Sequence, residues 1–387
     1  MKHIEVSKHF RKLFGGDFRF FSAPGRINII GEHTDYNDGF VLPAAIDKRI
    51  YLAIAPSGNQ KAIIHSFDFS ETVEFETGKD HQKLPHWAMY PYGVMMELHK
   101  AGYRTGGFKA VFGGDIPEGA GLSSSAALES VFALAFDQLN GFGLNRMTLA
   151  KTGQLAEHNY AGVRCGIMDQ FASLHGKAGH AMQLDCRSLD FRYFPLQLSE
   201  YELILADTKV KHSLAASEYN IRRAQCEEGV VLLKTQISGM RSLRDAEPED
   251  VLACRGILGE EIFLRCEYVT EENRRVLETC KALEEGNIEE TGRLMYESHH
   301  GLRAKYDVSC DELDLLVDTA SATKGVAGAR MMGGGFGGCT INLVKSEHAE
   351  EFREIASAAY RAKFGRDTVF YSVNIGDGAS EMDVPST

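Results

Sequence analysis

The sequence predicts a two-domain α+β protein, with a mixed α/β N-terminal domain and an α+β C-terminal domain. A chain of 387 residues fits roughly two domains. Strand-like and helix-like segments are mixed up to about residue 200; a long helix-rich stretch follows, and strands then return. The content of 44% hydrophobic and 25% charged residues is typical of a globular protein with packed cores. We place the domains at residues 1–195 and 196–387.

In the first domain, short runs rich in aromatic and branched side chains predict strands, and apolar residues at helical spacing predict helices. We expect helices at 86–100 and 145–161, and a third that follows a serine-rich loop and runs through Val131 to Leu139. The expected strands lie at 18–23, 51–55, 62–66 and 108–112.

The second domain is expected to begin with a strand at 203–207 and to continue as helices from 217 to about 301. A charged helix at 347–363 and a last strand at 369–373 are expected near its end. Two further strands are expected before that charged helix, at 327–332 and 340–344. The glycines at 333, 335 and 338 formally satisfy the GxGxxG dinucleotide pattern, but the strand-like CTINLV follows where a helix would be needed. A strand–loop–strand unit is the better interpretation. It largely excludes a dehydrogenase, which would need a dinucleotide-binding loop at this position.

Charge and cysteine usage exclude several classes of protein. The net charge of −12 argues against a protein that binds the nucleic-acid backbone, which would carry a basic face. The charged N-terminus MKHIEVSKHF has no apolar signal region, and the most apolar stretch, 131–136, is too short to span a bilayer. The eight cysteines form no CxxC pair. We therefore expect a cytoplasmic protein with reduced thiols and with no nucleic-acid or membrane partner.

The stretch GAGLSSSAALE at 119–129 carries the first indication of chemistry. Its glycines allow the backbone to approach a ligand closely, and the N-terminus of the following helix favours an anion such as a phosphate chain. The lysine of a Walker A loop is absent, because Leu122-Ser123 stands in its place. An ordinary serine-capped turn before a helix remains an equal alternative at this point.

The segment APGRINIIGEHTDYNDG at 23–39 combines arginine, carboxylates, imidazole and amides within a few positions. Such groups suit a polyhydroxylated ligand, because each sugar hydroxyl can both donate and accept hydrogen bonds. An exposed polar turn is the alternative interpretation of the segment taken alone.

Five segments together resemble the GHMP family of small-molecule kinases, and in particular its galactokinases. They follow one another over nearly the whole chain: GRINIIGEHTDYNDG, PEGAGLSSSAALE, CGIMDQ at 165–170, SEYNIRR at 217–223 and GARMMGGGFGGC. The resemblance implies the two-domain GHMP kinase fold, with a ferredoxin-like C-terminal domain and the active site between the domains.

The resemblance also implies roles at the sugar site. Asp169 would be the general base that takes the proton from the anomeric hydroxyl. Arg26 would lie beside it, favour the ionised carboxylate and stabilise charge on the transferring phosphoryl group. The residues implied to bind the sugar are Glu32, His33, Thr34, Asp35, Gly166 and Tyr219.

At the nucleotide site, backbone N–H groups of the serine-rich loop would hold the phosphates of ATP in place of a lysine. The loop positions implied are Gly119, Ala120, Gly121, Leu122, Ser123, Ser124 and Ser125. Ser66 would approach the nucleoside, and Ser125 with Glu157 would bind Mg²⁺.

The implied activity is ATP-dependent phosphorylation of D-galactose to α-D-galactose 1-phosphate and ADP, the entry step of galactose catabolism, by a monomer. Two alternatives remain. One is a GHMP kinase for another sugar, such as N-acetylgalactosamine or arabinose. The other is a galactose sensor that binds sugar and ATP without catalysis, although the intact serine–alanine run in the loop argues against it.

Overall fold

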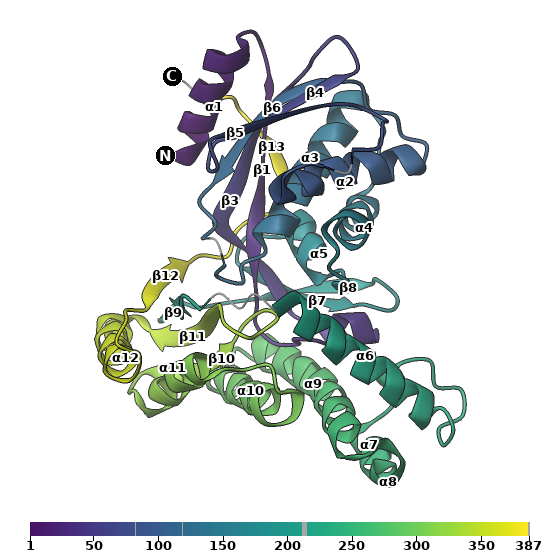
Figure 1. Ribbon diagram of the computed structural model, residues 1–387. Helices are drawn as coiled ribbons and strands as arrows, with labels where there is room; N and C mark the ends of the chain where they lie inside the picture. The colour runs from purple at the N-terminus through teal and green to yellow at the C-terminus, as the bar shows by residue number, and fades with distance from the viewer. Residues whose placement is uncertain (82, 118, 211–214, 386–387) are drawn as a thin grey trace.

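The computed structural model describes residues 1–81, 83–117, 119–210 and 215–385. The chain forms two regions stacked one above the other (Figure 1). The upper region contains both termini and a large sheet, and the lower region contains a second sheet and the long helices. This arrangement confirms the predicted α+β class.

The large sheet runs in the order β13-β1-β3-β6-β4-β5 within the described residues. Its pairs are antiparallel except for β4 and β6, which are parallel. The strands are β1 (Arg19–Asn28), β3 (Pro43–Pro56), β4 (Lys61–Ser66), β5 (Glu71–Glu76), β6 (Phe108–Gly114) and β13 (Ser380–Met382). Because β13 pairs with β1, the end of the chain returns to the N-terminal sheet. The division at residue 195 stays a prediction.

Helices cover both faces of this sheet. One helix, α1 (Lys2–Phe14), packs on β3 and β6 through Val6 and Phe10. The others pack together, with α3 and α5 in contact with β1 and β3. They are α2 (His86–Lys100), α3 (Ser124–Asn140), α4 (Arg146–Ala156), the π-helical η2 (Glu157–Ala161) and α5 (Met168–His175). At the start of α4, Asn145 caps the helix by accepting from the Thr148 N–H at 2.9 Å.

A small sheet, β2-β7-β8, joins the two regions; it contains β2 (Phe40–Val41), β7 (His180–Asp185) and β8 (Phe191–Pro195). The sheet of the second region is antiparallel and runs in the order β10-β11-β9-β12. Its strands are β9 (Tyr201–Asp207), β10 (Val326–Met331), β11 (Cys339–Lys345) and β12 (Val369–Val373).

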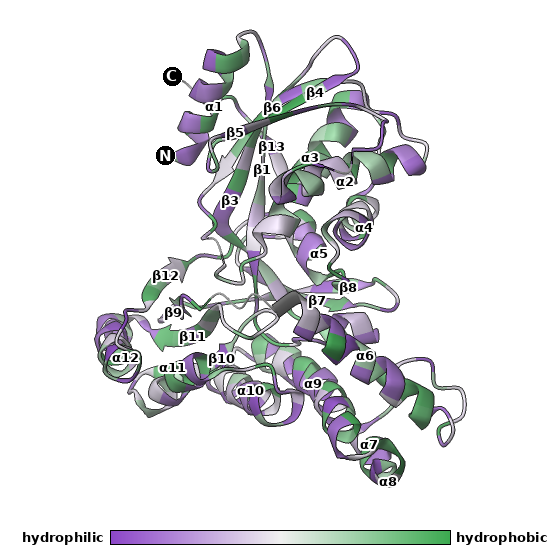
Figure 2. Cartoon of the chain, in the orientation of Figure 1, coloured by the Kyte–Doolittle hydropathy of each residue, from purple (hydrophilic) through white to green (hydrophobic). Residues whose placement is uncertain are grey.

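Helices pack on the second sheet and extend away from it (Figure 1). Hydrophilic and hydrophobic residues alternate along α6 and α9 (Figure 2), as expected for helices with one face in solvent. The elements are α6 (Ala215–Leu233), η3 (Leu243–Asp245), α7 (Pro248–Ala253), α8 (Arg255–Leu258), α9 (Glu260–Glu284), α10 (Ile288–Gly301), η4 (Leu302–Tyr306), α11 (Asp311–Ala322), η5 (Ser346–His348) and α12 (Ala349–Phe364). None of the helices in the described part of the chain combines the length and apolar character that crossing a bilayer requires.

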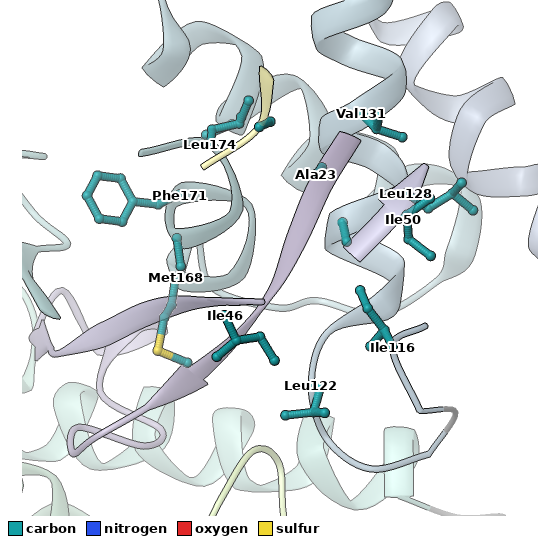
Figure 3. Close-up of a cluster of buried hydrophobic side chains, with 14 of the residues drawn as sticks. Ala23, Ile46, Ile50, Ile116, Leu122, Leu128, Val131, Met168, Phe171 and Leu174 are labelled. Atoms are coloured by element: carbon teal, nitrogen blue, oxygen red, sulfur yellow. The ribbon is translucent and has the colours of Figure 1, made fainter. Parts of the chain in front are cut away.

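The main core lies between the large sheet and α3 and α5, directly behind the serine-rich loop. Figure 3 shows part of this cluster: Ile116 and Leu122 come from the loop region, Leu128 from α3, and Met168 and Phe171 from α5. Since these side chains are almost fully buried, the core fixes the two segments that carry the serines and Asp169 relative to one another.

Most predicted elements are confirmed, including the strand–loop–strand at the glycine-rich motif, where β10 and β11 pair across residues 332–338. The prediction missed α1, α5, α11, β2, β5, β7, β8 and β13, and it made β1 and β3 too short. The missed strand β5 reads ETVEFE and lies at an edge of the sheet, with only Val73 and Phe75 buried. Two apolar residues among charged neighbours are a weak signal.

Candidate active site

The serine-rich loop rests directly on the end of β1. The Arg26 N–H donates to the Leu122 carbonyl at 3.1 Å. A Cβ on Gly25 would lie 2.6 Å from the same oxygen, so only glycine allows this approach. The two segments that carried the strongest sequence signals therefore meet backbone to backbone.

Arg26 and Asp169 form a bidentate ion pair, although they are 143 positions apart. Arg26 Nε donates to Asp169 Oδ1 at 2.8 Å, and Nη2 donates to Oδ2 at 2.9 Å. Arg26 also donates to the Gly121 carbonyl at 2.5 Å, which ties the loop to the pair. The pKa of Arg26 is raised: burial acts to lower it, but the charges of Asp169 and Glu32 outweigh burial.

Ser123 stands at the start of α3 in the left-handed region, with φ of 57°. Its hydroxyl does not cap the helix; it donates instead to Asp169 Oδ2. A strained backbone that directs a side chain onto a carboxylate is typical of a functional site.

Asp169 lines a cavity of about 270 Å³ between the two regions. The cavity is lined by residues from the 23–39 segment, from η2 to α5, from α6 and from the glycine-rich loop. They are Arg26, Glu32, His33, Asp35, Glu157, Val163, Cys165, Gly166, Met168, Asp169, Tyr219 and Gly333 to Gly335.

Two lining groups have shifted pKa values. Burial, reinforced by the charge of Asp169, raises the pKa of Asp35 to about 7, so near neutral pH this carboxyl can donate as well as accept a hydrogen bond. Burial lowers the pKa of His33 to about 3, which keeps its imidazole neutral. His33 Nδ1 shares a 2.7 Å hydrogen bond with the Tyr36 hydroxyl.

Glu32 is held from the second region. Its Oε1 accepts from Arg330 Nη2 at 2.8 Å and from the Gly333 N–H at 2.8 Å. Arg330 is fully buried and also donates to the carbonyls of Asn28 and Ile29 at 2.9 and 2.8 Å. Arg330 thus connects β10 to the end of β1 and fixes one oxygen of Glu32.

A second cavity, of about 430 Å³, lies on the other side of the serine-rich loop. Its walls include the rings of Phe69, Trp87, Tyr90 and Phe112, and Ser124 and Ser125 also line it. The Trp87 ring lies nearly parallel to Phe69, with 6.4 Å between centroids. Flat aromatic walls of this kind fit a nucleobase.

Comparison with known proteins identifies the family of the chain. The galactokinase galactose-binding signature matches residues 8–56, the GHMP kinase N-terminal domain matches 89–177, and the GHMP kinase C-terminal domain matches 279–362. A galactokinase of Thermotoga neapolitana is 45% identical over 360 residues, covering 93% of this chain and 99% of the relative. The chain belongs to the galactokinase family of GHMP kinases. A galactokinase of Bacillus subtilis is 41% identical and covers 98% of each chain.

Solved structures confirm the fold of this family member. The crystal structure of Lactococcus lactis galactokinase complexed with galactose has a TM-score of 0.95 at 34% identity, covering 98% of this chain and 99% of the other. The Methanococcus jannaschii mevalonate kinase has a TM-score of 0.63 at 20% identity, covering 94% and 99% of the two chains, which shows a shared GHMP fold. Family membership makes ATP the second substrate.

The structure brings together most of the residues predicted for the galactokinase site around the two cavities, whereas the loop positions 119–123, Thr34 and Ser66 line neither cavity. Thr34 is fully buried, and its hydroxyl lies 2.9 Å from the Gly31 carbonyl and 2.6 Å from the Phe40 carbonyl. Ser66 is fully buried in β4, and its Oγ accepts from the Phe69 N–H at 3.3 Å. Neither lines the cavity beside it. Both hydroxyls stabilise turns that place other lining residues, and their expected ligand contacts stay predictions.

The expected magnesium ligands lie between the two cavities. Ser125 Oγ donates to Glu157 Oε1 at 3.4 Å. Burial and the negative charge of Asp169 both raise the pKa of Glu157. A cation beside Glu157 would offset the repulsion between the two carboxylates. Among the described residues, no group of three or more His, Cys, Asp or Glu side chains could hold a metal. One carboxylate and one hydroxyl fit Mg²⁺, which takes its remaining ligands from phosphates and water.

Sequence reasoning missed several residues of the galactokinase site. They are Arg330, which holds Glu32; Gln170, which contacts Glu157; and the aromatic residues of the second cavity. Arg330 and Gln170 stand inside motifs that were identified, GARMMGGGFGGC and CGIMDQ, but no local pattern distinguishes them from their neighbours.

We expect Gly166→Ala to abolish most sugar turnover while leaving nucleotide affinity unchanged. A Cβ at this position would lie 1.8 Å from Asp35 Oδ2, so the Asp35 carboxyl must move away from the cavity. A displacement of about 1 Å in an active-site group can lower the rate by about 10²-fold. Measuring kcat/KM for galactose and Kd for ADP checks this. Gly256→Ala in α8, where a Cβ meets nothing within 4 Å, is the matched control. Normal kcat/KM in Gly166→Ala would place the sugar elsewhere.

Proposed function

We propose that this chain transfers the γ-phosphoryl group of ATP to the anomeric hydroxyl of D-galactose, giving α-D-galactose 1-phosphate and ADP. The observation that carries the proposal is the division of three consecutive serines between two cavities. Ser123 binds Asp169 at the first cavity, whereas Ser124 and Ser125 line the second. A phosphate chain held on this loop would point from the aromatic cavity toward Asp169.

In the sugar cavity, the anomeric hydroxyl would donate to Asp169, which takes its proton as the oxygen attacks the γ-phosphorus and ADP leaves. The Arg26 guanidinium compensates the negative charge beside the reacting atoms. A base positioned in this way contributes about 10²- to 10⁴-fold in rate. Glu32, His33, Asp35, Tyr219 and the backbone of Gly166 would bind the remaining hydroxyls.

At the loop, backbone N–H groups of residues 119–125 and the start of α3 would hold the phosphates. Ser125 and Glu157 would bind Mg²⁺, which when bound neutralises charge on the phosphates. The two glycine loops pack together, since a Cβ on Gly333 would lie 3.5 Å from the Gly121 carbonyl. The packed loops would limit access of water to the transferring group.

A panel of sugars tests the proposal: D-galactose, D-glucose, N-acetyl-D-galactosamine and L-arabinose, each with MgATP, followed by sugar-dependent ADP release. Phosphorus NMR of the product then identifies the phosphorylated hydroxyl. We expect turnover of galactose, with phosphate on the anomeric oxygen. Preference for another sugar would reassign the substrate, and galactose binding without ADP release would indicate a sensor.

We further expect Trp87→Leu to weaken ADP binding by about 1–3 kcal/mol, the contribution of stacking a base on an aromatic ring. Trp87 is the single tryptophan of the chain, so its fluorescence in the unsubstituted protein should change saturably as ADP binds. Galactose affinity should not change. Phe14→Leu, at an aromatic residue of α1 that packs on Phe10, serves as control. Unchanged ADP affinity in Trp87→Leu would exclude the aromatic cavity as the base site.

A further inference from the structure

Gln170 follows Asp169 on α5 and is fully buried between two carboxylates. Its side-chain Nε2 donates to Glu129 Oε2 at 2.8 Å and to Glu157 Oε2 at 2.8 Å. A primary amide has two N–H donors, so this contact uses both of them. The amide therefore joins α3, η2 and α5 at one point.

This contact fixes the orientation of the Glu157 carboxylate. Oε2 accepts from Gln170 and from the Cys165 thiol at 3.4 Å, and Oε1 is directed toward Ser125 Oγ at 3.4 Å. Glu157 is also the first residue of η2, a π-helical turn, and such turns occur frequently at functional sites. The backbone and the amide both hold Glu157 with a single oxygen toward the loop.

Glu129 and Gly153 keep Gln170 in place. Glu129 is fully buried, and burial raises its pKa; within the described part of the chain, its carboxylate has one hydrogen-bond partner, Gln170. Gly153 lies inside α4, where glycine destabilises a helix. A Cβ on Gly153 would lie 3.0 Å from Gln170 Cγ and 3.3 Å from Glu129 Cβ, so the glycine leaves room for the amide.

We propose that Gln170 is a positioning residue for Glu157, held by Glu129, and that it controls the binding of magnesium-bound nucleotide rather than of sugar. The proposal rests on the proposed function, since it assigns Glu157 to the metal. Gln170 lines neither the sugar cavity nor the aromatic cavity, and both donors of its amide are used by Glu129 and Glu157. Of its two carboxylate partners, Glu157 lines the sugar cavity and contacts Ser125, so we expect the effect of Gln170 on nucleotide binding to pass through Glu157.

The test compares Gln170→Met with the unsubstituted protein by isothermal titration calorimetry. ADP is titrated with Mg²⁺ and, separately, with EDTA; galactose is titrated alone. Loss of a residue that orients a metal ligand typically weakens metal binding by about 10- to 100-fold. We expect a loss of this size for ADP with Mg²⁺, and no change for ADP with EDTA or for galactose. The KM for MgATP should rise while the KM for galactose stays constant.

Gln154→Met on α4 is the matched control, because Gln154 donates to the Cys165 carbonyl at 3.3 Å and not to Glu157. If Gln170→Met does not fold, Gly153→Ala replaces it: alanine favours the helix but displaces Gln170, and the same selective loss is expected. Wild-type Mg²⁺ dependence in both variants would overturn the proposal, as would an equal loss of galactose affinity. Absence of galactose phosphorylation by the unsubstituted protein would overturn only the proposed function, because the calorimetry is independent of turnover.

Discussion

The Asp169→Asn variant is expected to bind galactose with nearly wild-type affinity while its kcat falls by about 10²- to 10⁴-fold. Asparagine has almost the same shape as aspartate and still offers an oxygen to Arg26 and Ser123, so the cavity should keep its form. It cannot accept the proton of the anomeric hydroxyl. Calorimetry with galactose and steady-state kinetics measure the two effects separately.

Asp318→Asn on α11 provides the control for the chemical change itself. Asp318 is exposed, lies 3.4 Å from Arg303 and does not line the cavity. We expect no effect on kcat there. Near-normal turnover in Asp169→Asn would contradict the role of base. Loss of galactose affinity together with turnover would mean that Asp169 shapes the cavity instead of taking the proton.

The Arg330→Met variant is expected to lose about 3–5 kcal/mol in free energy of unfolding, the typical cost of removing one partner of a buried ion pair. Arg330 is fully buried, and Glu32 beside it is only 2% exposed. Methionine fills much of the volume but removes the guanidinium that donates to the Glu32 carboxylate. Chemical denaturation measures this change, and galactose affinity should fall as well because Glu32 lines the cavity.

A double variant separates charge from packing. Glu32→Gln combined with Arg330→Met removes both charges, so part of the lost stability should return. The carbonyls of Asn28 and Ile29, which Arg330 binds, would still lack their donor. Arg255→Met breaks the exposed pair with Glu260 and should change stability by less than about 1 kcal/mol. If Arg330→Met lowers the free energy of unfolding no more than Arg255→Met does, the buried pair of Arg330 and Glu32 does not stabilise the fold.

Thr34 and Asp35 are neighbours in the sequence, but their side chains take different directions in the structure. Both belong to the same polar segment and both were expected to touch the sugar. Asp35 lines the cavity, whereas the Thr34 hydroxyl contacts two carbonyls of its own turn. The direction of a short polar side chain depends on backbone geometry that a motif does not specify.

The same limit applies to residues that act through non-local contacts. Arg330 lies about 300 positions from the Glu32 that it binds, and Gln170 lies 41 positions from Glu129. An arginine in a strand or a glutamine in a short helix has no local pattern that reveals its partner. The aromatic residues of the nucleotide cavity come from separate segments, such as Phe69 before β5 and Trp87 in α2, and they converge only in the folded chain.

The sequence alone determined the two-domain α+β class, the family resemblance and the chemical groups of the site. It could do so because glycine-rich loops, strand and helix periodicities and clustered polar residues are local properties of a chain. The tertiary structure decided which of those groups face the same cavity, that Ser123 turns from the helix to Asp169, and that Arg330 and Gln170 orient the carboxylates. These outcomes depend on burial and on pairing between distant segments, which exist only once the core has packed.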